Sequence, residues 1–436
     1  MLATTWHRAS RMADETPPSR NRYVDLLRAV SIVAVVLGHW LIAAPVVRDG
    51  RILGVNLLAA APWSQWLTWV FQVMPIFFLV GGFGNAGSWR AHRSRGGRYG
   101  GWLGARLQRL VLPAVPLVVV WSTFALVARS AGMDGSMLRL GSQVALIPLW
   151  FLAVYVLVVA LTPVTLTLWE RHGMASVAGL AAAALLVDVA RFHTTELVGW
   201  LNFLFVWAAL HQLGFAWRDG RIGGPRRSLM IAGAGLVVLA ALIWVGPYPV
   251  SMVGVPGAEA SNNSPPTLAL VALGVTQMGM ALAFEGRATR WLARSRPWAA
   301  TIAVNGSIMT IYLWHLTAMV AVVGLGFAAG GIGLATAPAT AAWWAGRPLW
   351  MAALTIATLP FLARFTRYER RPTGEPLRAA VSLTAAAAAC VGFAAIAGGG
   401  IADADSWLRP AAVAPVLAAG VLLIRRPATP GGRPTS

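Results

Sequence analysis

Three side chains that can carry charge share one stripe of the first long apolar segment. Asp25 and Arg28 are three residues apart, so they face the same side of a helix. His39 follows Arg28 by eleven residues, which places it within about 20° of the same face and roughly 16 Å further along the axis. Ionisable groups inside a membrane are costly, and they are functional by default. The stripe therefore predicts a site for chemistry.

His39 is the residue of this stripe best suited to moving a proton. Its ordinary pKa lies near neutral pH, so it can act as a general base on a hydroxyl or amine acceptor. Two simpler readings stay open. His39 packs against another helix through a hydrogen bond, and Arg28 is an interfacial anchor whose guanidinium reaches the headgroups.

Phe77 and Phe78 lie in the second apolar segment, next to Pro75 and several glycines. Such a sequence permits a kink and the close approach of a ligand or of another helix. Phe77 and Phe78 are therefore candidates to line a substrate pocket, and close helix packing alone is the alternative. Arg106 and Arg109 open the third segment at helical spacing. Their paired guanidinium groups suit phosphate, although arginines beside a span also serve as simple anchors.

Tyr312 and His315 are three residues apart in a later apolar segment and share a face. The spacing of the histidines indicates no metal site, because no further ligands accompany them. The chain also has no glycine-rich phosphate loop, no nucleophile elbow and no catalytic pair of carboxylates.

The elements that must position these residues are membrane helices. The 436 residues are 57% hydrophobic and 11% charged, whereas soluble domains carry about 25% charged residues. Runs of about 20 apolar residues predict an all-α polytopic membrane protein with twelve spans. These runs lie at residues 26–47, 66–87, 107–128, 144–168, 174–190, 198–217, 228–246, 267–285, 299–326, 348–366, 378–397 and 408–424.

The basic residues set the orientation of these spans. The formal net charge is +20, and none of the 35 basic residues is a lysine. The arginines gather in short loops, which indicates topology signals and attraction to anionic lipid, with no role in nucleic acid binding. Every even-numbered connection is basic, so both termini are expected in the cytoplasm. The single cysteine, Cys390, excludes an intramolecular disulfide.

The domain organisation follows from the same pattern. Residues 1–21 are expected to be a disordered, basic cytoplasmic tail, and residues 427–436 a second cytoplasmic tail. Residues 22–371 form a ten-helix core, and residues 372–426 add two C-terminal helices. No signal peptide precedes the first span, and no soluble domain is visible.

Together these motifs resemble membrane-bound acyltransferase family 3. Its first helix carries an arginine, ten residues and then a histidine, as Arg28 and His39 do. The motifs of the later helices resemble Ile76-Phe-Phe-Leu-Val-Gly-Gly-Phe83, Arg106-Leu-Gln-Arg109, Leu149-Trp-Phe-Leu152 and Tyr312-Leu-Trp-His315. Their order covers about residues 22–370. The second helix departs from the family, which more usually has Ser-Gly where this chain has Gly81-Gly82.

The resemblance implies an O-acyltransferase of the plasma membrane, with a bacterial origin expected. Such an enzyme moves an acyl group, usually acetyl, from cytoplasmic acyl-CoA to a hydroxyl of a carbohydrate, lipid or other cell-envelope acceptor. His39 would then be the base, Arg28 would orient it or bind the donor, and Asp25 would hold Arg28. Arg106 and Arg109 would bind the phosphates of the donor, and Tyr312 and His315 would line the acceptor side as substrate contacts.

Two other classes remain as alternatives. A multi-pass transporter or flippase fits the twelve spans and the intramembrane histidines. However, the chain shows no inverted internal repeat of the transporter kind. A sensor or structural membrane protein is the third reading, and it predicts that Arg28 and His39 tolerate substitution.

Overall fold

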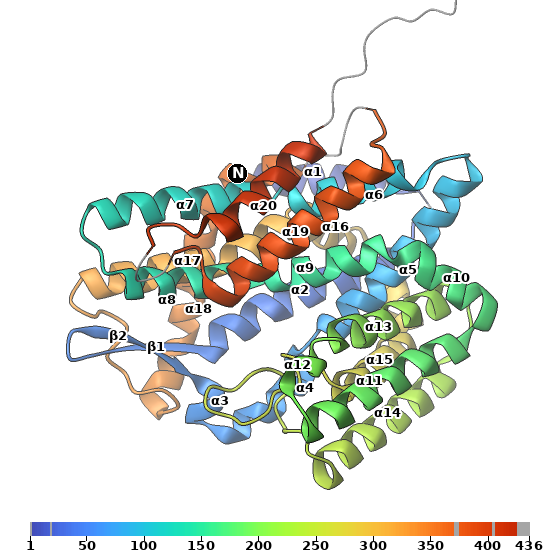
Figure 1. Ribbon diagram of the computed structural model, residues 1–436, viewed down its shortest axis with the longest axis horizontal. Coiled ribbons are helices and arrows are strands. Elements are labelled where there is room, and N and C mark those ends of the chain that lie inside the picture. The colour runs from blue at the N-terminus through green and yellow to red at the C-terminus, as the bar shows by residue number, and fades with distance from the viewer. Residues whose placement is uncertain (1, 18–19, 370–374, 403–405, 425–436) are drawn as a thin grey trace, which may run out of the picture. The chain divides into compact units, whose positions relative to one another are not determined.

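The computed structural model describes residues 2–17, 20–369, 375–402 and 406–424. These residues form helices and one small hairpin (Figure 1). Two compact units are present. Unit 1 contains Met1–Gly87 and Thr162–Ala363, and unit 2 contains Ser88–Leu161 and Arg364–Ser436.

The described residues hold nine helices long and apolar enough to cross a membrane, or up to eleven if each of two bent helix pairs is one span. When each bent pair is counted as one span, the difference from the twelve predicted spans lies at residues 408–424. There the structure has α20, Pro410–Leu423, a helix of 14 residues. At 1.5 Å per residue it is about 21 Å long, shorter than the ~30 Å hydrocarbon core of a bilayer.

Unit 1 carries the stripe of ionisable residues. Its long helices are apolar around most of their circumference, as expected for segments that contact lipid or other helices on every side. α14 packs along α15, and α11 packs along α13. The elements of this unit are α1 Leu2–Asp14, α2 Arg22–Ile42, β1 Ala43–Arg48, β2 Arg51–Asn56, α3 Leu57–Ala60, η1 Pro62–Leu67, α4 Thr68–Phe71, most of α5 Met74–Ser94, α10 Thr162–His172, α11 Met174–His193, α12 Glu196–Gly199, α13 Asn202–Arg218, α14 Pro225–Val245, α15 Leu268–Trp291, α16 Ser295–Asn305, α17 Ile308–Ala328 and most of α18 Ala341–Phe365.

The helix that carries the stripe, α2, has a defined start and a sharp end. The Asn21 side chain caps the first turn by accepting hydrogen bonds from two backbone N–H groups. The helix ends at Ile42, although the predicted apolar span runs to residue 47. The last residues of that span form β1, which pairs with β2. Asp49 and Gly50 both have positive φ, as the two-residue turn of a hairpin requires.

The N-terminal segment differs from the disordered tail that the sequence predicts. It forms α1, which packs on α16. Ala9 and Ala13 pack in one apolar cluster with Trp298 of α16. The Trp298 indole N–H donates to Thr16 Oγ1 at 2.9 Å. An amphipathic helix gains stability when its apolar face is buried on a neighbour, and composition alone does not show that the neighbour exists.

Two glycines let α5 and α13 approach closely. A Cβ atom at Gly82 would overlap the backbone carbonyl of His211, and one at Gly214 would overlap the carbonyl of Leu79. By contrast, a Cβ at Gly84 would meet nothing within 4 Å. The glycines of the second apolar segment therefore include one, Gly82, that is required for helix packing, which is the simpler of the two readings offered above.

Unit 2 joins the third and fourth predicted spans to the C-terminal helices. α19 packs against α6, α8, α9 and α20, and the Cys390 thiol donates to the carbonyl of Ala153 at 3.2 Å. The two units thus cut across the expected division into a core and a C-terminal addition. That boundary, at residues 371 and 372, lies outside the described residues, as does the tail at 427–436. The elements are α6 Tyr99–Val111, α7 Val115–Ser130, α8 Gly135–Leu146, α9 Pro148–Ala160, η2 Thr366–Glu369, α19 Ala379–Gly399 and α20.

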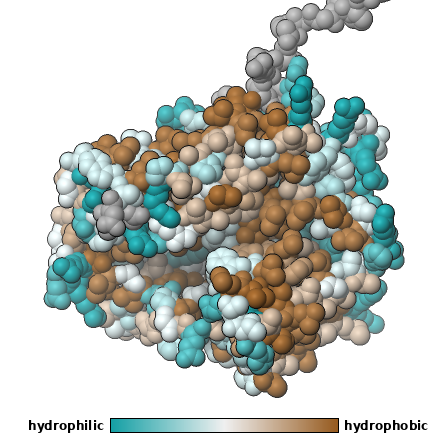
Figure 2. Space-filling view, viewed as in Figure 1, coloured by the Kyte–Doolittle hydropathy of each residue, from teal (hydrophilic) through white to brown (hydrophobic). Residues whose placement is uncertain are grey.

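Large apolar side chains remain exposed on several helices. Leu186 is 69% exposed on α11, and Val237 is 69% exposed on α14. Figure 2 shows hydrophobic residues in brown over much of the visible face. Exposed apolar area of this extent would be a liability in water, and it is the normal surface of a helix that faces lipid.

Candidate functional site

His39 and His315 form a direct pair inside unit 1. His39 lies in the last turn of α2, and His315 lies on α17, 276 residues further along the chain. Their Nδ1 and Nε2 atoms are 2.9 Å apart, and the ring planes are parallel to within 3°. His315 is fully buried, whereas His39 remains partly exposed. One histidine is therefore enclosed, and the other keeps part of its surface exposed.

The backbone assigns the protons of this pair. His315 Nδ1 lies 2.7 Å from the carbonyl oxygen of Tyr312, which can only accept, so Nδ1 carries the hydrogen. A neutral His315 then has an unprotonated Nε2, which accepts from Nδ1–H of His39. It follows that His39 Nε2 holds a free electron pair. The indole of Trp40 donates to the carbonyl of His315 at 3.2 Å and ties the two helices together.

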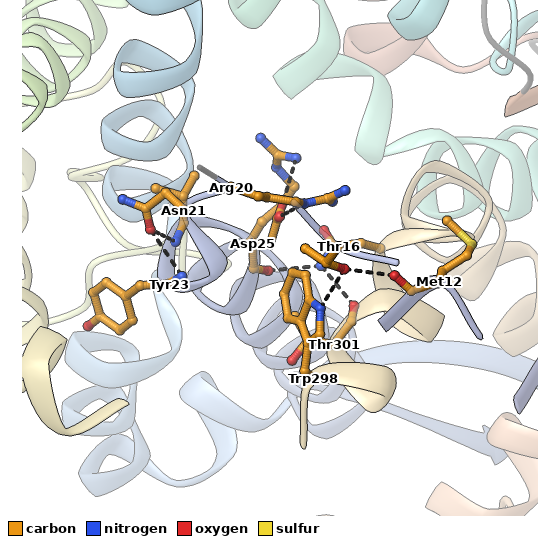
Figure 3. A network of polar contacts seen from close by, with 11 residues as sticks. Met12, Thr16, Arg20, Asn21, Tyr23, Asp25, Trp298 and Thr301 are labelled. Atoms are coloured by element: carbon orange, nitrogen blue, oxygen red, sulfur yellow. Dashed lines mark hydrogen bonds and ion pairs between the residues drawn. The ribbon is translucent and has the colours of Figure 1, made fainter. Parts of the chain in front are cut away.

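Asp25 forms ion pairs with two arginines at the other end of α2. Its Oδ2 accepts from Arg20 Nε at 2.7 Å, and its Oδ1 lies 3.6 Å from Nη1 of Arg28. Figure 3 shows Arg20 beside Asp25, in one network with Thr16 and Trp298. Asp25 is 8% exposed, so the pairing keeps a buried carboxylate compensated. Its partners hold the start of α2 against the N-terminal segment.

The predicted substrate-contacting residues have different surroundings. Phe78 is fully buried, and its ring stacks on Trp207 of α13 with centroids 4.5 Å apart, so it packs in the core. Phe77 is partly exposed. Tyr312 is only 3% exposed, and it contributes its backbone carbonyl to the histidine pair. The geometry thus ties Tyr312 and His315 to His39 and leaves Phe77 as the accessible member of this set.

Comparison with protein-family models gives one match: an acyltransferase domain covers residues 21–367, which is most of the chain. The chain belongs to the acyltransferase 3 family. Comparisons with curated proteins and with solved structures give no match. Family membership and the apolar helices together establish a multi-pass membrane protein of acyltransferase type.

The predicted donor-binding arginines of this family member belong to unit 2. Arg106 and Arg109 lie on α6, where Arg106 is partly exposed and Arg109 is exposed. The Arg106 guanidinium lies 5.9 Å from the ring centroid of Trp102. Their spacing on one helix agrees with the paired face expected from the sequence.

Three participants in the site were absent from the sequence prediction. Arg20 pairs with Asp25 alongside Arg28, Trp40 donates to the carbonyl of His315, and Asn305 donates to the backbone carbonyl of Asp25 at 2.9 Å. Arg20 and Trp40 lie close in sequence to predicted site residues, and this proximity is the only sequence feature that could have identified them. Asn305 lies 280 residues from its partner, and only the fold reveals the contact.

Proposed function

We propose that this protein transfers an acyl group, with acetyl expected, from cytoplasmic acyl-CoA to a hydroxyl of a carbohydrate, lipid or other cell-envelope acceptor. The transferred group is not an aminoacyl group. The proposed location is the plasma membrane of a bacterium. Family membership supports the reaction type, and the ionisable stripe on α2 supports a site within the membrane.

The observation that carries this proposal is the hydrogen-bond chain from the Tyr312 carbonyl through His315 to His39. It leaves Nε2 of His39, a partly exposed residue, with an electron pair that can accept a proton. In the proposed step, His39 Nε2 takes the proton of the acceptor hydroxyl while the hydroxyl oxygen attacks the thioester carbonyl. The C–S bond then breaks, and the imidazolium returns the proton to the departing thiolate of coenzyme A.

His315 has a supporting role in this step. As His39 gains a proton, its Nδ1–H still donates to His315 Nε2, so the developing positive charge remains hydrogen-bonded in a buried site. A carboxylate would stabilise the same charge more strongly, as in Ser-His-Asp triads. Because His315 is fully buried, we assign it to positioning His39 in preference to contacting the acceptor.

The remaining predicted residues take their roles from charge and position. Arg106 and Arg109 are proposed to bind the phosphates of coenzyme A, because arginine pairs with phosphate through two parallel hydrogen bonds. Arg28 is proposed to orient the donor, with Asp25 holding its guanidinium. The basic even-numbered connections favour cytoplasmic termini, so Asp25 and Arg28 are proposed to lie at the donor side.

The test compares cells that express the wild-type protein, His39→Ala, or His172→Ala. His172 is an exposed histidine on α10 and serves as the matched control. Mass spectrometry of envelope glycans and lipids should find a species heavier by one acyl group in the wild type and control, and not in His39→Ala. Equal acylation in all three strains would exclude His39 as the base. Transport by purified protein without acyl-donor turnover would favour a transporter or flippase.

A further inference from the structure

Arg347 lies among tryptophans on α18. Its guanidinium carbon is 3.9 Å from the ring centroid of Trp343 and 5.2 Å from that of Trp350. Trp343 is 3% exposed and Trp350 is 9% exposed, while Arg347 is partly exposed. When a guanidinium stacks on an indole, its N–H groups still point outward in the guanidinium plane, where they can bind an oxyanion.

Three N–H donors of this group lack an acceptor. Nε and Nη1 of Arg347 and Nε1 of Trp350 are buried, and none has a hydrogen-bond partner within the part of the chain that the structure describes. Buried donors are nearly always satisfied in native proteins, and exceptions gather where a ligand, ion or water completes the site. These three donor atoms lie on two neighbouring side chains, and one of these side chains, Arg347, is a cation. They therefore indicate a missing anionic acceptor.

No carboxylate supplies that acceptor. Within the described residues, Nε and Nη1 of Arg347 contact no carboxylate oxygen. Trp343 packs in a cluster with Ala44, Leu57 and Ala61, and Leu41 packs against this cluster. Leu41 follows His39 by two residues. The arginine thus lies near the end of α2 that carries the histidine pair.

We propose that Arg347, Trp343 and Trp350 form a binding site for a phosphate group. The guanidinium would supply two charge-assisted hydrogen bonds and the Trp350 indole a third. Phosphate at this place can come from a phospholipid headgroup or from a free phosphorylated ligand such as an acceptor. The site does not depend on the acyl-transfer proposal, because it rests on separate residues and on binding alone.

The first experiment titrates inorganic phosphate into the full-length protein in a neutral detergent, against chloride at equal ionic strength, and follows the midpoint of thermal unfolding. Phosphate should raise the wild-type midpoint. Arg347→Gln should weaken the apparent affinity about tenfold or more, because two charge-assisted bonds are lost. Trp350→Phe removes one neutral N–H and should weaken it about fivefold.

Matched controls lie elsewhere in unit 1. Arg48→Gln removes an exposed arginine of β1, and Trp200→Phe changes a tryptophan that is 57% exposed. Both should bind phosphate as the wild type does. Arg347→Lys tests the planar geometry with the charge kept, and it should recover only part of the affinity.

The second experiment identifies the source of the phosphate. Native mass spectrometry counts the phosphatidylglycerol molecules retained by the wild type and by Arg347→Gln. One molecule fewer on the variant would assign the site to a lipid headgroup. Equal retention with phosphate binding lost would assign it to a free phosphorylated ligand. If wild type and Arg347→Gln respond alike to both probes, the proposal is overturned.

Discussion

At the residue scale, the tautomer of His39 depends on a neighbour that need not touch substrate. His315→Gln can still accept the Nδ1–H of His39 through its amide oxygen, whereas His315→Leu cannot. We expect His315→Leu to lower the rate of acyl transfer about a hundredfold or more, and His315→Gln to keep a substantial part of it. The measurement is incorporation of labelled acetyl groups from acetyl-CoA into acceptor-containing membranes.

The control for these two variants is that each keeps the wild-type fold. Both variants should elute as the wild type does in size exclusion and show similar thermal midpoints. A pH–rate profile separates a positioning role from structural damage. A change in the surroundings of the base shifts the apparent pKa of the profile, whereas structural damage lowers the rate at every pH. Full activity of His315→Leu would contradict the role assigned to His315.

Single residues were the part of the site most open to prediction. His39, His315 and Asp25 each stand out as polar groups in apolar helices, and that cost is visible in a sequence. Their partners are not visible, since the bond between His39 and His315 joins positions 276 residues apart. The surroundings of Phe78 are equally invisible in the sequence: its motif suggested substrate contact, and in the structure its buried ring stacks on Trp207.

At the element scale, the approach of α5 to α13 can be tested at Gly82. Replacing Gly82 with Ala forces a methyl group into the backbone of His211, so the helices must separate. Overpacking of this kind costs about 1–3 kcal/mol. We expect a lower thermal midpoint for Gly82→Ala. Gly84→Ala is the matched control, because its methyl group has open space, and an equal effect of both variants would contradict the close approach.

Most elements could be predicted from the sequence because spanning length is a strong signal. The exceptions have local causes. The C-terminal part of the first predicted span forms β1 because Asp49-Gly50 makes a two-residue turn that pairs it with β2. α1 was missed because its stability comes from packing on α16, a segment almost three hundred residues away.

At the scale of the whole molecule, hydropathy alone does not decide whether α20 crosses the membrane. Its 14 residues are short for a bilayer, but a short apolar helix can be accommodated by local thinning of the lipid. The arginines at positions 425, 426 and 433 favour a cytoplasmic C-terminus, which requires α20 to cross after α19. Charge and length therefore make opposite predictions for one helix.

Reporter fusions distinguish these two topologies. If α20 crosses, green fluorescent protein fused after residue 436 should fluoresce, and alkaline phosphatase fused there should be inactive. Fusions after Gly400, between α19 and α20, should give the reverse, and fusions after Glu375, before α19, should again report the cytoplasm. These two positions calibrate the assay within the same chain. Active phosphatase after residue 436 would leave α20 on the outer side, with eleven spans and termini on opposite sides of the membrane. In that case the cost of spanning the hydrocarbon core with a helix of only 14 residues would exceed the preference of the C-terminal arginines for the cytoplasm.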